Sequence, residues 1–145
     1  MRRIAMTAAL LAGAPALAGP MQPGLWQITT RITDIKMAGA PPGMAAAMRG
    51  RPIAVSRCVT PAEAAQGPKE AMKSSKQCRY TSYSAIGGRI AATTVCDMGQ
   101  TRVTGSSSGS FTPTSFTANF RSVMSGAQSM TTAGVVTGKR VGACR

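Results

Sequence analysis

Apolar and polar residues alternate along most of the chain, and this period of two predicts β-strands. In the first such stretch, residues 24–35, Trp26 and Ile28 fall on one face, while Gln27 and Thr29 fall on the other. Similar stretches continue to the C-terminus and are separated by short turns. The strands predicted in this way cover residues 24–35, 53–59, 78–86, 89–97, 100–108, a segment around 116–122, and 130–141.

Short turns between the predicted strands indicate an antiparallel arrangement. Gly87-Gly88 separates two of the strands and suits the positive φ angles of a two-residue hairpin turn. About seven short strands connected by turns of this kind are typical of all-β domains. We therefore expect a mainly β fold, in which an antiparallel meander forms a small sandwich or a partly closed barrel.

One helical excursion interrupts the strands. Thr60-Pro61-Ala62-Glu63 places Thr at the N-cap, Pro at the first helical position and Glu at the third, which is the capping-box arrangement. Gly67-Pro68 ends this helix after a few residues. In the preceding loop, residues 37–51, Met44–Met48 could form a helical turn that is too short to be stable by itself.

The first 18 residues have the pattern of a signal peptide. Arg2 and Arg3 form a basic start, residues 4–17 are apolar, and Ala16-Leu17-Ala18 gives the small-x-small pattern that signal peptidase cleaves. No later segment is long and apolar enough to be a transmembrane anchor. The sequence therefore predicts a signal peptide at 1–18, followed by a single disulfide-stapled β domain at 19–145, which we expect to be a monomer in the periplasm.

Four cysteines, Cys58, Cys78, Cys96 and Cys144, are expected to form two disulfides, because an even number in an exported protein is typical of a disulfide framework. A zinc site is the alternative, but the chain has no His and no Cys-x-x-Cys pair. The sequence therefore favours disulfides over a metal site.

The predicted hairpin restricts which cysteines can pair. If Gly87-Gly88 is a two-residue turn, Cys78 lies opposite Asp97, so Cys78 and Cys96 point to opposite faces. A bond between them would then require a three-residue turn. Of the remaining pairings we favour Cys58 with Cys78, and Cys96 with Cys144.

The chain is strongly basic, with 17 Lys and Arg against 4 Asp and Glu, a net charge of +13. An exported protein with such a charge meets anionic lipid headgroups and wall polymers rather than nucleic acid, so we expect no nucleic-acid partner. The basic residues are dispersed, apart from Lys139-Arg140, which is the candidate anion-contacting pair. A generally basic surface without a dedicated anion site is the alternative.

The residue types argue against an enzyme, a metal or a cofactor. The chain lacks His, the commonest general base and metal ligand, and only Asp34, Glu63, Glu70 and Asp97 carry carboxylates. No motif indicates a nucleophile. Met37, Met44 and Met48 lie in the loop of residues 37–51, which we call the Met-rich loop. Their thioethers could hold Cu(I), but copper sites usually add His or Cys, so packing is the favoured role of these methionines. We expect a non-enzyme without cofactors.

Several short motifs follow one another along residues 20–145. They are Gly24 and Trp26, Cys58-Val59-Thr60-Pro61 at a helix start, the mid-chain Cys78 and Cys96, and the closing Gly138-Lys139-Arg140-Val141-Gly142-Ala143-Cys144. In this order they resemble domain-of-unknown-function family 3617, small exported proteins of Gram-negative bacteria. The resemblance implies an envelope location and a shared fold, and it brings no catalytic residue.

Two functions from different classes fit these observations. The first is a non-catalytic binding module that holds an anionic or apolar component of the cell envelope, with Trp26, Phe116 and Phe120 as the candidate ligand-facing residues. The second is a structural or interaction protein that docks to another envelope protein through the Met-rich loop. A contiguous pocket beside the aromatic residues would favour the first, and a filled interior with an exposed Met patch would favour the second.

Overall fold

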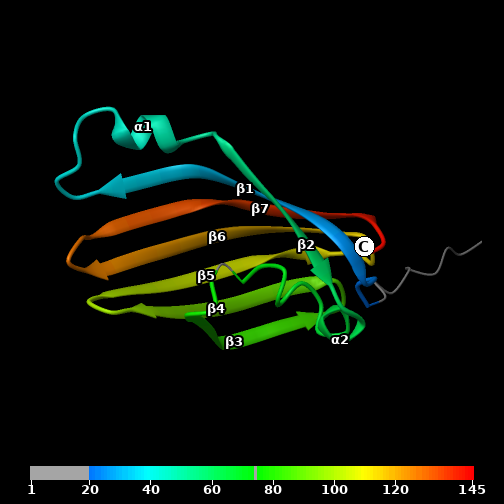
Figure 1. Cartoon of the computed structure of the whole chain (residues 1–145). Helices are drawn as coiled ribbons and strands as arrows, with labels where there is room; N and C mark the ends of the chain where they lie inside the picture. Colours follow the sequence, from blue (N-terminus) through cyan, green and yellow to red (C-terminus); the bar gives the residue numbers. More distant parts are fainter. Residues whose placement is uncertain (1–19, 74) are drawn as a thin grey trace, which may run out of the picture.

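A computed structural model describes residues 20–145 except Ser74, and the predicted signal peptide lies outside the described residues. The described chain forms one seven-stranded antiparallel sheet and two short helices (Figure 1). Among these residues, no helix is both long and apolar enough to cross a membrane. The strands are β1 (Gly24–Met37), β2 (Pro52–Val59), β3 (Cys78–Ile86), β4 (Arg89–Met98), β5 (Thr101–Phe111), β6 (Ser115–Gly126) and β7 (Met130–Gly142), and the helices are α1 (Met44–Met48) and α2 (Pro61–Ala64).

The strand order is β2-β1-β7-β6-β5-β4-β3. From β3 to β7 the chain is a meander, and β1 then pairs with the last strand. The strongly curved sheet leaves β2 and β3 as its two edges, so it does not close on itself (Figure 1). The mainly β, antiparallel prediction is confirmed, and the form adopted is the partly closed one.

The curvature gives the sheet an inner face and an outer face. The inner face carries Trp26 and Ile28 of β1, Val136 of β7, and Phe116 and Phe120 of β6. The strand registers place them on one face, since Ile28 and Phe116 both oppose Gly138, and Val136 precedes Gly138 by two residues on β7. Their neighbours along each strand point outward, which is the alternation that the sequence shows. We call the end where β1 begins the closed end, and the end where β1 finishes and β7 begins the open end.

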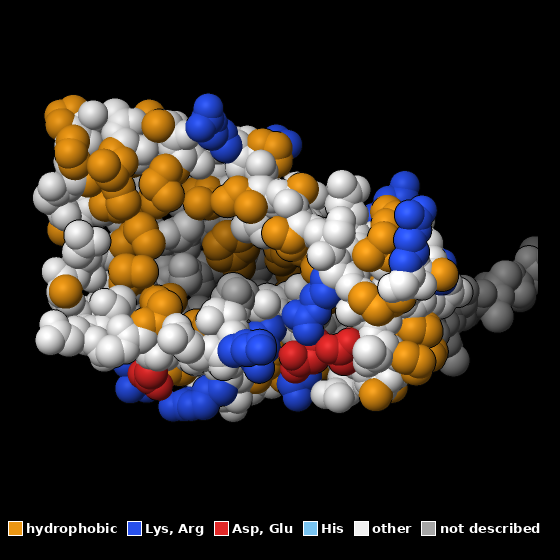
Figure 2. Space-filling model, viewed as in Figure 1, with side chains coloured by type: hydrophobic (Ala, Val, Ile, Leu, Met, Phe, Trp, Pro, Cys, Tyr) orange, Lys and Arg blue, Asp and Glu red, His pale blue; other side chains and the backbone are white. Residues whose placement is uncertain are grey.

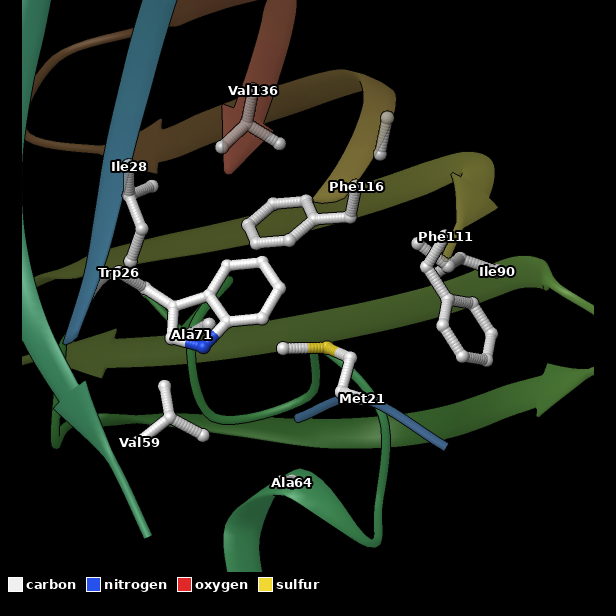
Figure 3. Packing of buried hydrophobic residues seen from close by; sticks show 11 residues of the cluster. Met21, Trp26, Ile28, Val59, Ala64, Ala71, Ile90, Phe111, Phe116 and Val136 are labelled. Atoms are coloured by element: carbon white, nitrogen blue, oxygen red, sulfur yellow. The ribbon is translucent and has the colours of Figure 1, made fainter. Parts of the chain in front are cut away.

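The hydrophobic core occupies the closed end (Figure 3). Trp26 is fully buried there, its ring stacks on Phe116 with centroids 6.0 Å apart, and its indole N–H donates to the carbonyl oxygen of Gln22 at 3.1 Å. The remaining core side chains surround this pair. They are Met21, Ile28, Val59, Ala64, Ala71, Ile90, Phe111, Ala118 and Val136.

Two rings of β6 lie over glycines of β7. Phe116 opposes Gly138, and Phe120 opposes Gly134. A Cβ added to Gly138 would collide with the Phe116 ring, and one added to Gly134 would lie 2.8 Å from Cζ of Phe120. The sequence therefore places glycine where an aromatic ring must approach the neighbouring backbone.

Residues 60–73, the covering segment, close the inner face at the closed end. The predicted capping box is present: the Glu63 amide N–H donates to the Thr60 hydroxyl at 3.3 Å, and the Thr60 N–H donates to the Glu63 carboxylate at 2.8 Å. Ala64, Pro68 and Ala71 are buried against the sheet. The short helix is therefore stabilised by its cap and its packing, since four residues cannot form a stable helix alone.

The prediction of two disulfides is confirmed, but the favoured pairing is wrong. The structure joins Cys58 to Cys144 and Cys78 to Cys96. The first bond lies at the closed end, where Leu25 of β1 has Cys58 of β2 on one side and β7 on the other. This bond therefore ties the C-terminus across β1 to β2.

A β-bulge explains why the hairpin argument failed. The two-residue turn is present, and Ile86 opposes Arg89 beside it. Between Tyr80 and Ser82, however, β3 contains one extra residue. The bulge shifts the register by one position, so Cys78 lies opposite Cys96 and on the same face.

Candidate functional site: an apolar trough at the open end

The covering segment reaches only the closed end, so part of the inner face remains uncovered toward the open end, although Ile35 and Thr132 there are buried. Figure 2 shows the resulting hollow, with hydrophobic side chains along its wall. On the edge strand β2, Ile53 and Val55 share a face with Thr30 and Ile28 of β1, yet they are 59% and 55% exposed. We call this open part of the inner face the trough.

Methionines gather at the open end of the trough. Met130 of β7 lies between Met37 of β1 and Met124 of β6, and it pairs directly with both. Directly opposed side chains share one face of a sheet, with Cβ atoms about 5 Å apart. We call these three half-buried residues the methionine row. On the nearby α1, Met44 and Met48 are 45% and 40% exposed.

At its inner end the trough leads into a cavity of about 290 Å³, which lies between the middle of the sheet and the covering segment. Met72 of the covering segment forms part of its wall. The apolar lining also includes Val103 of β5, Phe120 of β6 and Val136 of β7. The Cys78–Cys96 disulfide lines the cavity as well, so the bond fixes the wall formed by β3 and β4. The cavity is thus apolar on most sides and is formed by rigid strands.

The charged residues that line the cavity are all basic. They are Lys73, Arg79 and Arg121, and no acidic residue is found among the described lining residues. Arg79 and Arg121 are exposed and alternate with the inner-facing Tyr80 and Phe120, so their side chains point to the outer face. Arg79 lies 3.9 Å from the carboxylate of Asp97, whereas none of the described carboxylates forms an ion pair with Lys73. Lys73 therefore gives the cavity wall a positive charge that a bound anion could neutralise.

Each of the four carboxylates lies beside an arginine, away from the trough floor. The Glu63 carboxylate accepts a hydrogen bond from the Thr60 backbone N–H, and this bond lowers the pKa of Glu63. The Arg57 guanidinium, 3.2 Å from the carboxylate, also lowers the pKa. The pairs are Asp34 with Arg49, Glu63 and Glu70 with Arg57, and Asp97 with both Arg79 and Arg102. Within the described part of the chain, no group of three or more His, Cys, Asp or Glu is placed to hold a metal ion.

Two tyrosines of β3 attach the covering segment to the sheet. The Tyr80 hydroxyl donates to the Lys69 carbonyl at 2.6 Å, and the Tyr83 hydroxyl donates to the Gln66 carbonyl at 2.9 Å. Burial raises the pKa of both phenols, that of Tyr83 to about 12. On the other edge of the sheet, Arg57 donates to the Glu70 carbonyl at 2.7 Å. The covering segment thus bridges the two edge strands and forms the inner wall of the cavity.

The three predicted ligand-facing residues have different positions. Phe120 lines the cavity, but Trp26 and Phe116 are buried in the closed end and form part of the core. All three share the inner face, as their alternation indicated. What the sequence could not show is that the covering segment hides one half of that face.

The predicted anion-contacting pair does not form one patch. Lys139 and Arg140 are neighbours on β7, so their side chains point to opposite faces. Arg140 is half-buried and donates through Nε to the Pro23 carbonyl at 2.8 Å, while Lys139 is exposed. Arg140 therefore fastens the start of β1, and Lys73 is the better placed basic residue for a ligand in the trough.

Several residues of the site were not singled out from the sequence. Val103, Met124 and Met130 carry no motif, and their alternation within strands is the signal that places them on the inner face. Lys73 could not have been found, because its position depends on the path of the covering segment.

The fold and the trough define a class: a small, disulfide-bonded β protein whose open, curved sheet exposes an apolar inner face. The disulfides indicate an oxidising compartment outside the cytoplasm. Residues 21–144 match the family described as "Protein of unknown function (DUF3617)", and the chain belongs to this family, as its motifs predicted. No curated protein and no solved structure gives a significant match to the chain.

Proposed function

We propose that this protein is a non-catalytic binding module that holds an apolar component of the cell envelope in the trough. One observation carries the proposal: a partly open apolar surface, which runs from the methionine row through Met124 to Val103 in the cavity wall, lies beside the packed core of the closed end. Exposed apolar surfaces of this kind mark binding sites, because exposure to water is unfavourable unless a ligand covers them.

The proposal includes location and chemistry. The chain is exported by its predicted signal peptide and acts in the periplasm of a Gram-negative bacterium, where apolar envelope components need a carrier or a receptor. The pairing of every carboxylate with an arginine supports a non-catalytic role, because a paired surface carboxylate is a weak general base.

Binding of a neutral fluorescent probe, N-phenyl-1-naphthylamine, tests the proposal with two matched variants. Val103 of β5 lines the cavity, whereas Val123 of the neighbouring β6 points to the outer face and is 41% exposed. Val103→Ser should weaken probe binding by about 3- to 10-fold, since it makes the wall polar, and Val123→Ser should leave it unchanged. Equal effects of the two substitutions, or no binding by the unmodified protein, would contradict the proposal.

A second candidate function is docking to another envelope protein through the Met-rich loop. The exposure of Met44 and Met48 on α1 favours it, since adaptable methionines are common on protein-binding surfaces. Crosslinking in the periplasm followed by mass spectrometry separates the two functions. Recovery of a co-purified lipid supports the binding module, and a crosslinked protein that is lost in the double variant Met44→Ser/Met48→Ser supports docking.

A further inference from the structure

We infer that the ligand of the trough is an anionic lipid with a single acyl chain, whose headgroup binds at Lys73. This inference rests on the proposed function and adds the chemical class of the ligand. It is drawn from the length of the trough, the small volume of its cavity and the positive charge of Lys73 at the cavity wall.

The length of the trough fits one acyl chain. Val136 lines the cavity and Met130 lies in the methionine row, six residues apart on β7. At about 3.3 Å per residue, this part of the strand is about 20 Å long. The hydrocarbon core of a bilayer is about 30 Å thick, so the chains of one leaflet extend over about 15 Å. A chain of that length can lie along β7 between the cavity and the methionine row.

The width of the trough favours one chain over a bulky ligand. The cavity, at about 290 Å³, is as small as the smallest ligand pockets, which begin at about 300 Å³. Its floor is limited by Phe120, and the stacked pair of Trp26 and Phe116 blocks the way further into the closed end. Flexible methionines suit the other end, because they can repack around a chain that has no fixed shape.

The headgroup position follows from the charges. Lys73 lies on the covering segment and lines the cavity together with Arg79 and Tyr80 of the edge strand β3. The Lys73 side chain is half-buried, so water screens it less than a fully exposed lysine. A phosphate or carboxylate at this position would form a charge-assisted hydrogen bond with the ammonium group. A cationic headgroup would instead be repelled by the ammonium group of Lys73.

Lysophospholipids with the same tetradecanoyl chain and different headgroups test the inference. Lysophosphatidylglycerol is anionic and lysophosphatidylcholine is net neutral, and both can be titrated by calorimetry below their micelle concentrations into the mature, disulfide-bonded protein. We expect the anionic lipid to bind about 10-fold more tightly, as a charge-assisted contact in a partly dry site implies.

Two matched variants locate the headgroup. Lys73→Gln should reduce the preference to about 2-fold, whereas Lys76→Gln, an equal charge change at an exposed position of the same region, should leave it near 10-fold. Lys73→Arg should restore the preference, which distinguishes loss of charge from loss of folding.

The possible failures are distinguishable. Equal binding of the two lipids, or equal effects of Lys73→Gln and Lys76→Gln, would overturn the inference about the headgroup while leaving an apolar binding module in place. If neither lipid binds, and the neutral fluorescent probe does not bind either, the proposed function itself is wrong.

Discussion

The two disulfides close loops of very different length, and removing them one at a time should destabilise the protein to different extents. The Cys58–Cys144 bond joins residues 86 positions apart, and the Cys78–Cys96 bond joins residues 18 positions apart. Loop-closure entropy then gives about 5 kcal/mol for the long bridge and about 3 kcal/mol for the short one. The short bridge also joins two strands that remain paired by their backbone hydrogen bonds.

The long bridge has no such support. Cys58 lies on β2 and Cys144 lies just after the end of β7, and β1 separates these two strands. Without the bond, the residues after β7 have little to hold them, and the unfolded chain gains more freedom. We therefore expect Cys58→Ala/Cys144→Ala to be less stable than Cys78→Ala/Cys96→Ala by about 1 to 2 kcal/mol.

Urea unfolding at pH 7 measures this difference. Trp26 is the only tryptophan and is fully buried in the core, so its fluorescence reports the loss of the closed end directly. The variant without the long bridge should also show the larger m-value, because its unfolded state is less compact. Equal midpoints and m-values in the two double variants, or a reversed order, would refute the entropic reasoning.

Three further predictions address the core, the covering segment and the trough. Gly138→Ala should lower the free energy of unfolding in urea by about 1 to 3 kcal/mol, because the added methyl group meets the Phe116 ring. Gly142→Ala, whose methyl group enters open space, should change the free energy of unfolding little, and similar losses in the two variants would contradict this prediction. Burial raises the pKa of Tyr80 and Tyr83 above the ordinary value of 10.0, so the folded protein keeps both phenol protons at a pH where the unfolded chain loses them. The free energy of unfolding should therefore be full below pH 10 and fall as the pH rises toward 12. Tyr83→Phe should show a smaller fall in the same pH titration. Peroxide oxidation of the methionine row, verified by mass spectrometry, should lower the affinity for N-phenyl-1-naphthylamine without changing the circular dichroism spectrum, because sulfoxides are polar. An unchanged affinity would argue against the trough as the binding site.

Much of the fold could be predicted from the sequence because local signals determine it. Strand β3 has the predicted bounds, and the capping box at Thr60 and the turn at Gly87-Gly88 are present as expected. Each of these features depends on a few adjacent residues, whose backbone preferences and alternation suffice.

The disulfide pairing and the location of the trough could not be predicted in this way. The bulge in β3 adds Thr81 to one strand, and no residue type marks such an insertion in the sequence. The covering segment reaches both edge strands through contacts such as that of Tyr80 with Lys69, which are distant in sequence and leave no periodic pattern. Alternation identified the inner face, but only the path of this segment decides which half stays open.

The small core and the open trough explain why this fold needs two covalent bridges. The buried aromatic side chains Trp26, Phe111 and Phe116 all lie at the closed end, so the aromatic burial that stabilises the chain is concentrated in half of the sheet. Filling the open end with larger fixed side chains would add burial, but it would also remove the space for a ligand. The disulfides stabilise the fold without filling the trough, and one of them, Cys78–Cys96, also forms part of the cavity wall. Stability and binding are thus supplied by different parts of the same sheet, as expected where a binding site must leave apolar surface unpaired.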